Sequence, residues 1–265
     1  MSYLSNPNLA IIPLRKFIPK SLLFVWLSVA LFACQRHTHV VKTDTAYLPM
    51  GDQKQEDSTI VATISPYKQK MEQEMNTVIG TNSKLLELFK PESPLGNWAA
   101  DLVYEKTSEY LGFMEIDFAL LNYGGLRIPS LPAGDITKSK VFELMPFDNV
   151  LVVVEIKGSE LQLLFDRAAQ DGGWPVSKHI KMTMRGGKAQ DVRINDKKVL
   201  SDKIYKVATN DYLANGGDQC TFLKDNTVTS SNKLFRNAIL EYITTKTAAG
   251  KALQAKVENR VFILK

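Results

Sequence analysis

The chain has 265 residues, of which 45% are hydrophobic and 23% are charged. These values are ordinary for a globular protein and exclude disordered and collagen-like chains, and the length suffices for one large domain or two small ones. Residues 1–33 hold three of the 33 basic residues and no acidic one, so the remaining chain carries 30 basic and 28 acidic residues, a net charge of +2 that excludes the basic surface needed for nucleic-acid binding.

The first predicted element is an export signal. Three basic residues, Arg15, Lys16 and Lys20, precede an apolar run over residues 22–33. This order is typical of a secretory signal peptide, and the run is shorter than the ~20 apolar residues that a transmembrane helix needs. We therefore predict a signal peptide over residues 1–33.

The cysteine after the apolar run predicts how the mature chain is held at a membrane. The sequence Leu-Phe-Ala-Cys at residues 31–34 resembles the lipobox of bacterial lipoproteins, in which the cysteine becomes the first mature residue and carries lipid chains. Two or more acyl chains hold a protein stably on a bilayer. We predict lipidation of Cys34, which leaves Cys220 without a disulfide partner. The alternatives are an uncleaved anchor and an ordinary signal peptide in which Cys34 is incidental.

Residues 34–57 are predicted to form a flexible tether. They are rich in Gln, Lys, Asp and Thr and lack helical periodicity. His37 and His39 resemble a metal-binding pair, but no further ligand types lie nearby, which favours a solvated tether. The folded domain is predicted to cover residues 58–265.

Two Ser-Pro pairs predict the first helices of this domain. Serine caps a helix and proline suits its first position, so the pair at residues 65–66 predicts a helix whose apolar spacing continues to Val78. The pair at residues 93–94 predicts a second helix. Its buried face is expected to carry Leu95, Trp98, Ala99 and Leu102.

Two nearly continuous apolar runs, residues 116–121 and residues 150–156, predict buried strands. Gly158 is expected to end the second strand, and Ser159 with Gln162 is typical of a capping box that opens a helix. The buried stripe of that helix is expected to be Leu161, Leu164, Phe165 and Ala168.

The apolar period changes to two in the later part of the chain. Residues 180–184 and 192–194 alternate on either side of Gly186 and Gly187, which predicts a hairpin, and residues 204–209 alternate as a further strand. A helix carrying Phe235, Ala238, Ile239 and Tyr242 follows, and residues 261–264 form a short apolar end. The predicted helices cluster early in the chain and the predicted hairpins late. This order favours an α+β fold, a mixed sheet with packed helices, over a doubly wound sheet.

Three loops collect glycines beside polar or aromatic residues: residues 121–127, 145–149 and 211–218. Paired glycines let the backbone approach a ligand, although a single such loop is more often an ordinary turn. Neither glycine pair fits a dinucleotide or P-loop motif. Beyond the tether, His179 is the single histidine, so the sequence predicts neither a catalytic residue nor a metal site.

Taken in order, the motifs of these loops resemble the C-terminal domain of the 5′-nucleotidase family, from about Thr59 to Lys265. They are Glu-Ser-Pro-Leu-Gly-Asn at residues 92–97 with Asp101, Asn-x-Gly-Gly-x-Arg at 122–127, Pro-Phe-x-Asn at 146–149, and Tyr-Leu-Ala-Asn-Gly-Gly-Asp at 212–218. The resemblance implies a domain that binds the nucleoside, while a separate N-terminal metallophosphoesterase domain of the family holds two metals and performs hydrolysis.

The resemblance also implies a role for individual residues. The aromatic clamp on the base falls on Phe147 and Tyr212, the ribose-binding aspartate on Asp218, and the residues near the base and phosphate on Asn122 and Arg127. Gly124, Gly125, Gly216 and Gly217 are expected to shape the loops. The alternative is core packing for the two rings and a turn cap for Asp218. These side chains suit the roles chemically. An aromatic ring can stack on a base, a carboxylate can accept hydrogen bonds from ribose hydroxyls, and a guanidinium can donate hydrogen bonds to a phosphate.

The sequence departs from the family in two respects. A substrate arginine of the family has no counterpart at residues 88–91, where Lys90 could act only as a point charge without bidentate geometry. The metal-binding domain is also missing, so we expect no cofactor in this chain and divalent metals in a partner. Glu92 and Asp101 are expected to be structural partners rather than catalytic acids.

The leading hypothesis is the nucleotide- or nucleoside-binding subunit of a split 5′-nucleotidase in nucleotide catabolism. A separate metallophosphoesterase chain supplies the metals, and the lipid anchor places this chain in the bacterial cell envelope, facing the periplasm or the outside. The alternatives are a lipoprotein that binds nucleotides or nucleosides without hydrolysis, and a structural lipoprotein with a vestigial pocket.

We predict that Cys34→Ala yields an unlipidated protein that leaves the membrane fraction, because a nearly neutral domain needs acyl chains to stay on a bilayer. Fractionation and mass spectrometry of the N-terminal peptide check this. An unchanged membrane fraction for the variant, with no lipid on the wild type, shows that Cys34 is incidental.

Overall fold

The computed structural model describes residues 57–264. The predicted signal peptide, Cys34 and the tether up to residue 56 lie outside the described residues. Within residues 57–264, none of the helices combines the length and the apolar character needed to cross a membrane.

The described elements are a mixture of helices and strands without strict alternation. The helices are α2 (Ser58–Met75), α3 (Pro94–Tyr110), α4 (Lys138–Leu144), α5 (Gly158–Gln170), α6 (Asp211–Ala214) and α7 (Phe235–Ala248), with 3-10 turns η1 (Tyr123–Gly125), η2 (Gly217–Gln219) and η3 (Thr221–Leu223). The strands are β1 (Val78–Asn82), β2 (Leu86–Glu87), β3 (Phe118–Ala119), β4 (Ser130–Leu131), β5 (Gly134–Thr137), β6 (Val150–Lys157), β7 (Ile180–Arg185), β8 (Lys188–Ile194), β9 (Lys197–Lys198), β10 (Ile204–Asn210), β11 (Thr227–Leu234) and β12 (Val261–Ile263).

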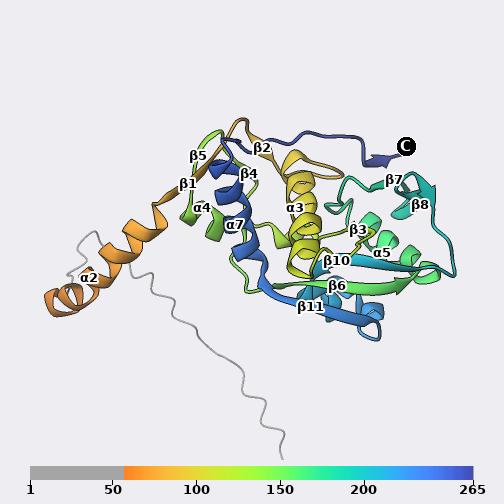
Figure 1. The fold of residues 1–265 in the computed structure, drawn as a ribbon, viewed down its shortest axis with the longest axis horizontal. Coiled ribbons are helices and arrows are strands. Elements are labelled where there is room, and N and C mark those ends of the chain that lie inside the picture. The colour runs from red at the N-terminus through yellow and green to blue at the C-terminus, as the bar shows by residue number, and fades with distance from the viewer. Residues whose placement is uncertain (1–56, 265) are drawn as a thin grey trace, which may run out of the picture. The chain divides into compact units, whose positions relative to one another are not determined.

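A mixed four-stranded sheet in the order β11-β6-β10-β3 forms the centre of the domain (Figure 1). β6 is antiparallel to both β10 and β11, and β3 is parallel to β10. Leu151 and Val153 pack in one apolar cluster with α3 and α7, whereas Val152, Val154 and Ile156 pack in the other with α5. Burial of both faces explains why β6 is a continuous apolar run rather than an alternating one.

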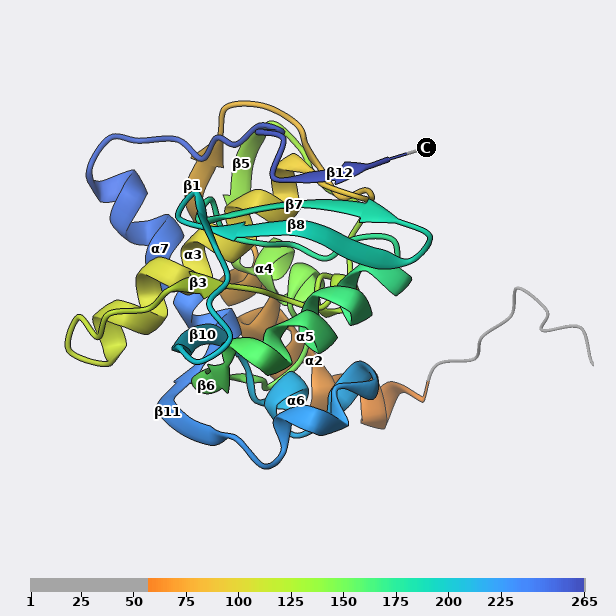
Figure 2. The same cartoon turned by 90° about the vertical axis from the view of Figure 1, so that its right-hand side faces the viewer.

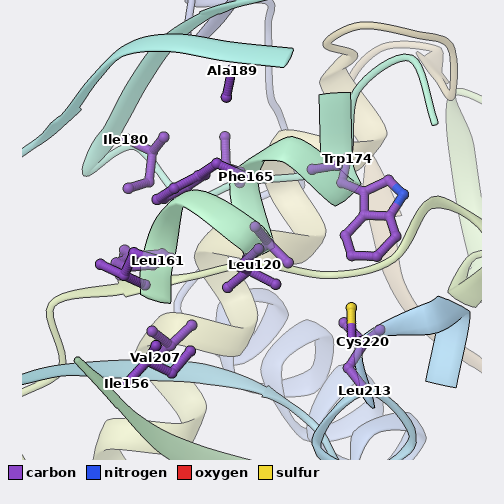
Figure 3. Packing of buried hydrophobic residues seen from close by; sticks show 14 of the residues in the cluster. Leu120, Ile156, Leu161, Phe165, Trp174, Ile180, Ala189, Val207, Leu213 and Cys220 are labelled. Atoms are coloured by element: carbon purple, nitrogen blue, oxygen red, sulfur yellow. The ribbon is translucent and has the colours of Figure 1, made fainter. Parts of the chain in front are cut away.

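A second sheet, β12-β7-β8-β9, adds an outer layer, and α5 lies between it and the central sheet (Figure 2). Figure 3 shows this contact from close by: Leu161 and Phe165 of α5 lie between Ile180 and Ala189 of the outer sheet and Ile156 and Val207 of the central one. The predicted hairpin around Gly186 and Gly187 is present as β7 and β8. The predicted α+β fold with a mixed sheet is therefore confirmed.

The start predicted for the first helix is wrong. α2 begins at Ser58, and Pro66 lies inside it. The Asp57 side chain accepts hydrogen bonds from the backbone N–H groups of Thr59 and Ile60, at 2.9 and 3.3 Å, and so caps the earlier start. Val78, expected on this helix, belongs instead to β1.

The predicted capping box is also wrong. α5 begins at Gly158, so Ser159 lies within its first turn, and no side chain in the described part of the chain caps this end. The later turn between β9 and β10 takes over that role, because Gly158 and Ser159 donate their backbone N–H groups to the carbonyl oxygens of Lys203 and Ser201, at 2.8 and 3.0 Å. Free N–H groups at a helix start can be satisfied by any nearby acceptor.

Glu92 and Asp101 fasten the C-terminal segment to α3. Glu92 is 6% exposed and accepts hydrogen bonds from the Asn97 amide and from the backbone N–H groups of Glu258 and Arg260, each at 2.7 Å. Asp101 forms a two-pronged ion pair with the Arg260 guanidinium, at 2.9 and 2.6 Å. Both acids therefore have the structural contacts expected of them.

We predict that Glu92→Ala destabilises the domain by about 3 kcal/mol, because it removes the acceptor of the Glu258 and Arg260 backbone N–H groups and one of the two acceptors of the Asn97 amide. Glu87→Ala, which removes an exposed carboxylate of β2, is the matched control and is expected to stay within ~0.5 kcal/mol of wild type. Urea unfolding of both variants checks this. Equal free energies of unfolding contradict the structural role of Glu92.

Candidate functional site

A cavity of about 250 Å³ lies where three loops meet. The loops follow β3, α4 and β10, and they converge because β10 ends where β6 begins, with Asn210 paired to Leu151. The residues that line the cavity are Asn122, Gly124, Gly125, Arg127, Phe147, Asn149, Tyr212 and Asp218. All five residues predicted to bind substrate are thus in one place.

The two aromatic side chains of the cavity are exposed. Phe147 is 39% and Tyr212 is 44% exposed, whereas Leu144 and Met145, which shortly precede Phe147 in the chain, are fully buried. The alternative of core packing for these two rings is therefore excluded. Exposed rings at a concave surface provide apolar faces that a flat ligand can stack against.

Tyr212 and Asp218 are joined by two hydrogen bonds. The Tyr212 hydroxyl donates to Oδ1 of Asp218 at 2.9 Å and accepts from the backbone N–H of Asp218 at 3.2 Å. The hydrogen bond to the Asp218 carboxylate raises the pKa of Tyr212, because it stabilises the neutral hydroxyl. Gly217 permits this pairing, since a Cβ at its position would lie 2.5 Å from the Tyr212 ring.

The loop that carries Asp218 has an unusual backbone. Gly216 has φ of 87°, and Asp218 and Gln219 adopt φ of 47° and 66°, a region that costs free energy for residues other than glycine. The Nε of Arg167 donates to the carbonyl oxygen of Asp218 at 2.7 Å. This contact from α5 holds the loop in the conformation that places the carboxylate beside Tyr212.

Asn122 is buried, at 5% exposed, yet it lines the cavity. Its Oδ1 accepts a hydrogen bond from the Asn210 amide at 3.2 Å, which orients the side chain. No described residue accepts from its Nδ2, so the amide N–H groups remain available as donors. Gly125 makes room for this side chain, since a Cβ there would lie 3.0 Å from Oδ1.

Arg127 provides the positive charge of the cavity. Its guanidinium carbon lies 5.6 Å from the centroid of the Phe147 ring, and Nη1 donates to the carbonyl oxygen of Gly124 at 3.3 Å. Among the described residues, no carboxylate forms an ion pair with it. A guanidinium with unused donors can form a forked contact with an anionic group.

Lys90 does not take part in this cavity. Its ammonium group contacts Asp171, with a distance of 3.2 Å to the carboxylate, and lies 4.6 Å from the centroid of the Tyr123 ring. The lysine is therefore engaged elsewhere, and the phosphate role considered for it from the sequence has no support in its position.

His179 and the acidic residues do not form a metal site. His179 stacks on Tyr104 with ring centroids 4.0 Å apart, and burial lowers its pKa. Within residues 57–264, no group of three or more His, Cys, Asp or Glu side chains could hold a metal ion. The described residues thus do not fit the two-metal centre that the resemblance assigns to another domain. Cys220 is buried and unpaired in this part of the chain.

Four residues that line or support the cavity were not predicted as site residues from the sequence. Asn149 lines it directly, Arg167 holds the Asp218 loop, and Asp211 accepts from the backbone N–H of Val150 at 3.1 Å. Arg236 of α7 holds the loop that carries Phe147. Asn149 stood within a quoted motif and Asp211 within the loop of residues 211–218, but the two arginines carry no local pattern that separates them from ordinary charged residues.

Comparisons with known proteins identify the family. A sequence profile of the family described as "5′-nucleotidase, C-terminal domain" matches residues 74–225, so the chain belongs to that family. The 5′-nucleotidase of Vibrio vulnificus (strain CMCP6) is 30% identical over 173 residues, which are 62% of this chain and 30% of that protein. Protein UshA of Escherichia coli (strain K12) is 27% identical over 172 residues, with the same coverage.

A solved structure agrees with this assignment. The 5′-nucleotidase precursor from Thermus thermophilus superposes with a TM-score of 0.67 and 26% identity, over 79% of this chain and 44% of that chain. The chain thus spans about a third of the length of the curated relatives and less than half of the solved structure.

We predict that Phe147→Ala and Tyr212→Ala each weaken nucleoside binding by ~1–3 kcal/mol, because each removes one stacking face. Phe262→Ala, which removes a ring that is 45% exposed outside the cavity, is the control and is expected to bind normally. Calorimetric titration with adenosine checks this. Normal binding by both cavity variants contradicts a clamp formed by these rings.

We predict that Asp218→Ala weakens ribonucleoside binding by ~1.5–3 kcal/mol, the worth of hydrogen bonds to a charged group, and affects a 2′,3′-dideoxynucleoside much less. Asp191→Ala is the matched control, because Asp191 also has a left-handed φ, of 45°, but lies outside the cavity. Titration of both ligands checks this. An equal loss for both ligands argues for general damage instead of ribose recognition.

Proposed function

We propose that this chain is the nucleotide- or nucleoside-binding subunit of a split 5′-nucleotidase. Lipid on Cys34 anchors it in the bacterial cell envelope, and a separate metallophosphoesterase chain hydrolyses the phosphate ester. The observation that carries the proposal is one open cavity that combines two exposed rings, a carboxylate and a guanidinium. Membership of the 5′-nucleotidase C-terminal domain family supports it.

The chemistry of the cavity suits the three parts of a nucleotide. The base stacks between Phe147 and Tyr212, an arrangement that tolerates different bases because every base has a π-face. The Asp218 carboxylate has acceptor capacity left beyond its hydrogen bond from Tyr212 and accepts from ribose hydroxyls. Arg127 donates to the phosphate, and the free N–H groups of Asn122 donate to the base or the sugar.

The residues that line the cavity are the reason for assigning hydrolysis to the partner. Hydrolysis of a phosphate ester requires a nucleophile and stabilisation of the charge that develops on the phosphoryl oxygens. Among the described residues that line the cavity, Arg127 is the one cation, and none is a histidine or a cysteine. In the proposed arrangement this chain binds and orients the nucleotide, and the divalent metals of the partner supply the Lewis acid.

The test is phosphate release from AMP by the mature chain alone, by a candidate metallophosphoesterase alone, and by both together with divalent metal. The proposal expects substantial release only from the mixture. Metal-dependent release by this chain alone, persisting after removal of contaminants, contradicts the split arrangement. Nucleotide binding without any gain in activity in the mixture favours the alternative, a lipoprotein that binds nucleotides without hydrolysis.

We predict that Arg127→Ala weakens binding of AMP by ~1.5–3 kcal/mol more than binding of adenosine, because only AMP presents a phosphate to the guanidinium. Lys90→Ala is the matched control, since it removes a cation that does not line the cavity, and it is expected to leave the difference between the two ligands unchanged. Titration of both ligands checks this. The same loss for AMP and adenosine contradicts the phosphate role.

A further inference from the structure

The loop that carries Phe147 has no regular structure of its own. It connects α4, which ends at Leu144, to β6, which begins at Val150. Asp148 is exposed and Phe147 is 39% exposed, so packing of these side chains does not fix the backbone between the two elements. Another group must therefore set where the Phe147 ring lies.

The guanidinium of Arg236 makes a set of contacts with this loop. Its Nη1 donates to the carbonyl oxygens of Met145, Pro146 and Phe147, at 3.4, 3.1 and 3.2 Å. Its Nη2 pairs with Oδ1 of Asp148 at 2.5 Å. One side chain from the second residue of α7 thus contacts four successive loop residues that lie about ninety positions earlier in the sequence.

The position of Arg236 shows that these contacts are its main polar interactions. Its side chain is 12% exposed, and the guanidinium carbon lies 4.5 Å from the centroid of the Phe142 ring. Its buried Nε has no partner among the described residues. The hydrogen bonds that the guanidinium makes all go to the loop. A planar guanidinium can bond several acceptors at once, which a lysine ammonium cannot do in the same geometry.

The neighbouring residue extends the attachment. The backbone N–H of Phe235 donates to the carbonyl oxygen of Asn149 at 2.8 Å, and the Phe235 side chain is fully buried. The start of α7 is therefore fixed in the core and holds the loop from residue 145 to residue 149. Arg236 itself does not line the cavity.

We propose that Arg236 is a positioning residue of the nucleoside site, which holds the Phe147 ring in place for stacking without touching the ligand. The inference rests on the proposed function, since it concerns how the same cavity recognises a base. A ring held in its binding position before the ligand arrives avoids the ordering cost of binding. Loss of Arg236 therefore weakens base stacking and leaves the ribose contact of Asp218 intact.

The experiment is a pair of double-mutant cycles on the mature chain, with adenosine as the ligand. R236M is measured alone, with F147A and with D218A. We expect R236M to weaken binding about tenfold, to add nothing in the F147A background, and to add its full effect in the D218A background. Non-additivity with one partner alone identifies the residue through which Arg236 acts.

The other outcomes overturn the inference. Additive effects with both F147A and D218A, or loss of additivity with both, mean that R236M damages the site in general. Unchanged adenosine binding by R236M means that the loop holds Phe147 without Arg236. If R236M does not fold, D148N decides the question, because it weakens the Nη2 contact on an exposed side chain. D148N is expected to show a smaller loss with the same pattern in the two backgrounds, and any other pattern overturns the inference.

The two proposals fail in distinguishable ways. If wild-type protein does not bind adenosine or AMP at millimolar concentration, the proposed function fails and the inference on Arg236 fails with it. If wild-type protein binds and R236M binds equally well, only the inference fails. R193M, which removes a half-buried arginine of β8, is the control for loss of a guanidinium and is expected to bind as wild type does.

Discussion

The antiparallel pairing of β6 with β10 is the constraint on which the site depends. Its register places Asn210 opposite Leu151, so the chain enters β6 at the point where it leaves β10. The hydrogen bond from the Val150 N–H to the Asp211 carboxylate closes this corner. The loops that carry Phe147 and Tyr212 therefore face each other across one cavity, although they are separated by more than sixty residues of sequence. Side chains of β6 pack in apolar clusters on both faces of the sheet, so a shift of this register would require both clusters to repack.

Much of the fold could be predicted from the sequence, and the failures have local causes. β6 was predictable because a strand buried on both faces has a continuous apolar run. The β7–β8 hairpin was predictable because strands buried on one face have apolar residues at every second position. β11 was missed, since its sequence Thr-Val-Thr-Ser-Ser-Asn-Lys-Leu is mostly polar and it pairs at the edge of the sheet. The start of α2 was misplaced because a proline inside a helix looks the same in sequence as a proline that begins one.

Some residues of the candidate site could likewise be predicted from the sequence, and others could not. Residues that lie in glycine-rich loops, such as Asn122, Tyr212 and Asp218, could be found because their motifs are contiguous in sequence. Arg167 and Arg236 could not, since each acts on a loop far along the chain mainly through main-chain carbonyl oxygens, with one further contact from Arg236 to the Asp148 carboxylate. A carbonyl acceptor is offered by every residue, so such contacts leave no mark in the sequence of the loop that they hold. The supporting residues become visible only when the backbone is in place.

The hydrogen bond between Tyr212 and Asp218 has a consequence for selectivity. The Asp218 carboxylate is hydrogen-bonded to the hydroxyl of the Tyr212 ring on which the base is proposed to rest. In the proposed function, one hydrogen-bonded pair would therefore contact both the sugar and the base. A ligand must then present its hydroxyl groups at a fixed height and angle relative to its flat ring. A free sugar could make only the contact with Asp218, and a free base could make only the contact with the Tyr212 ring. In the proposed function, this pair of residues would favour a joined nucleoside over a free base or a free sugar.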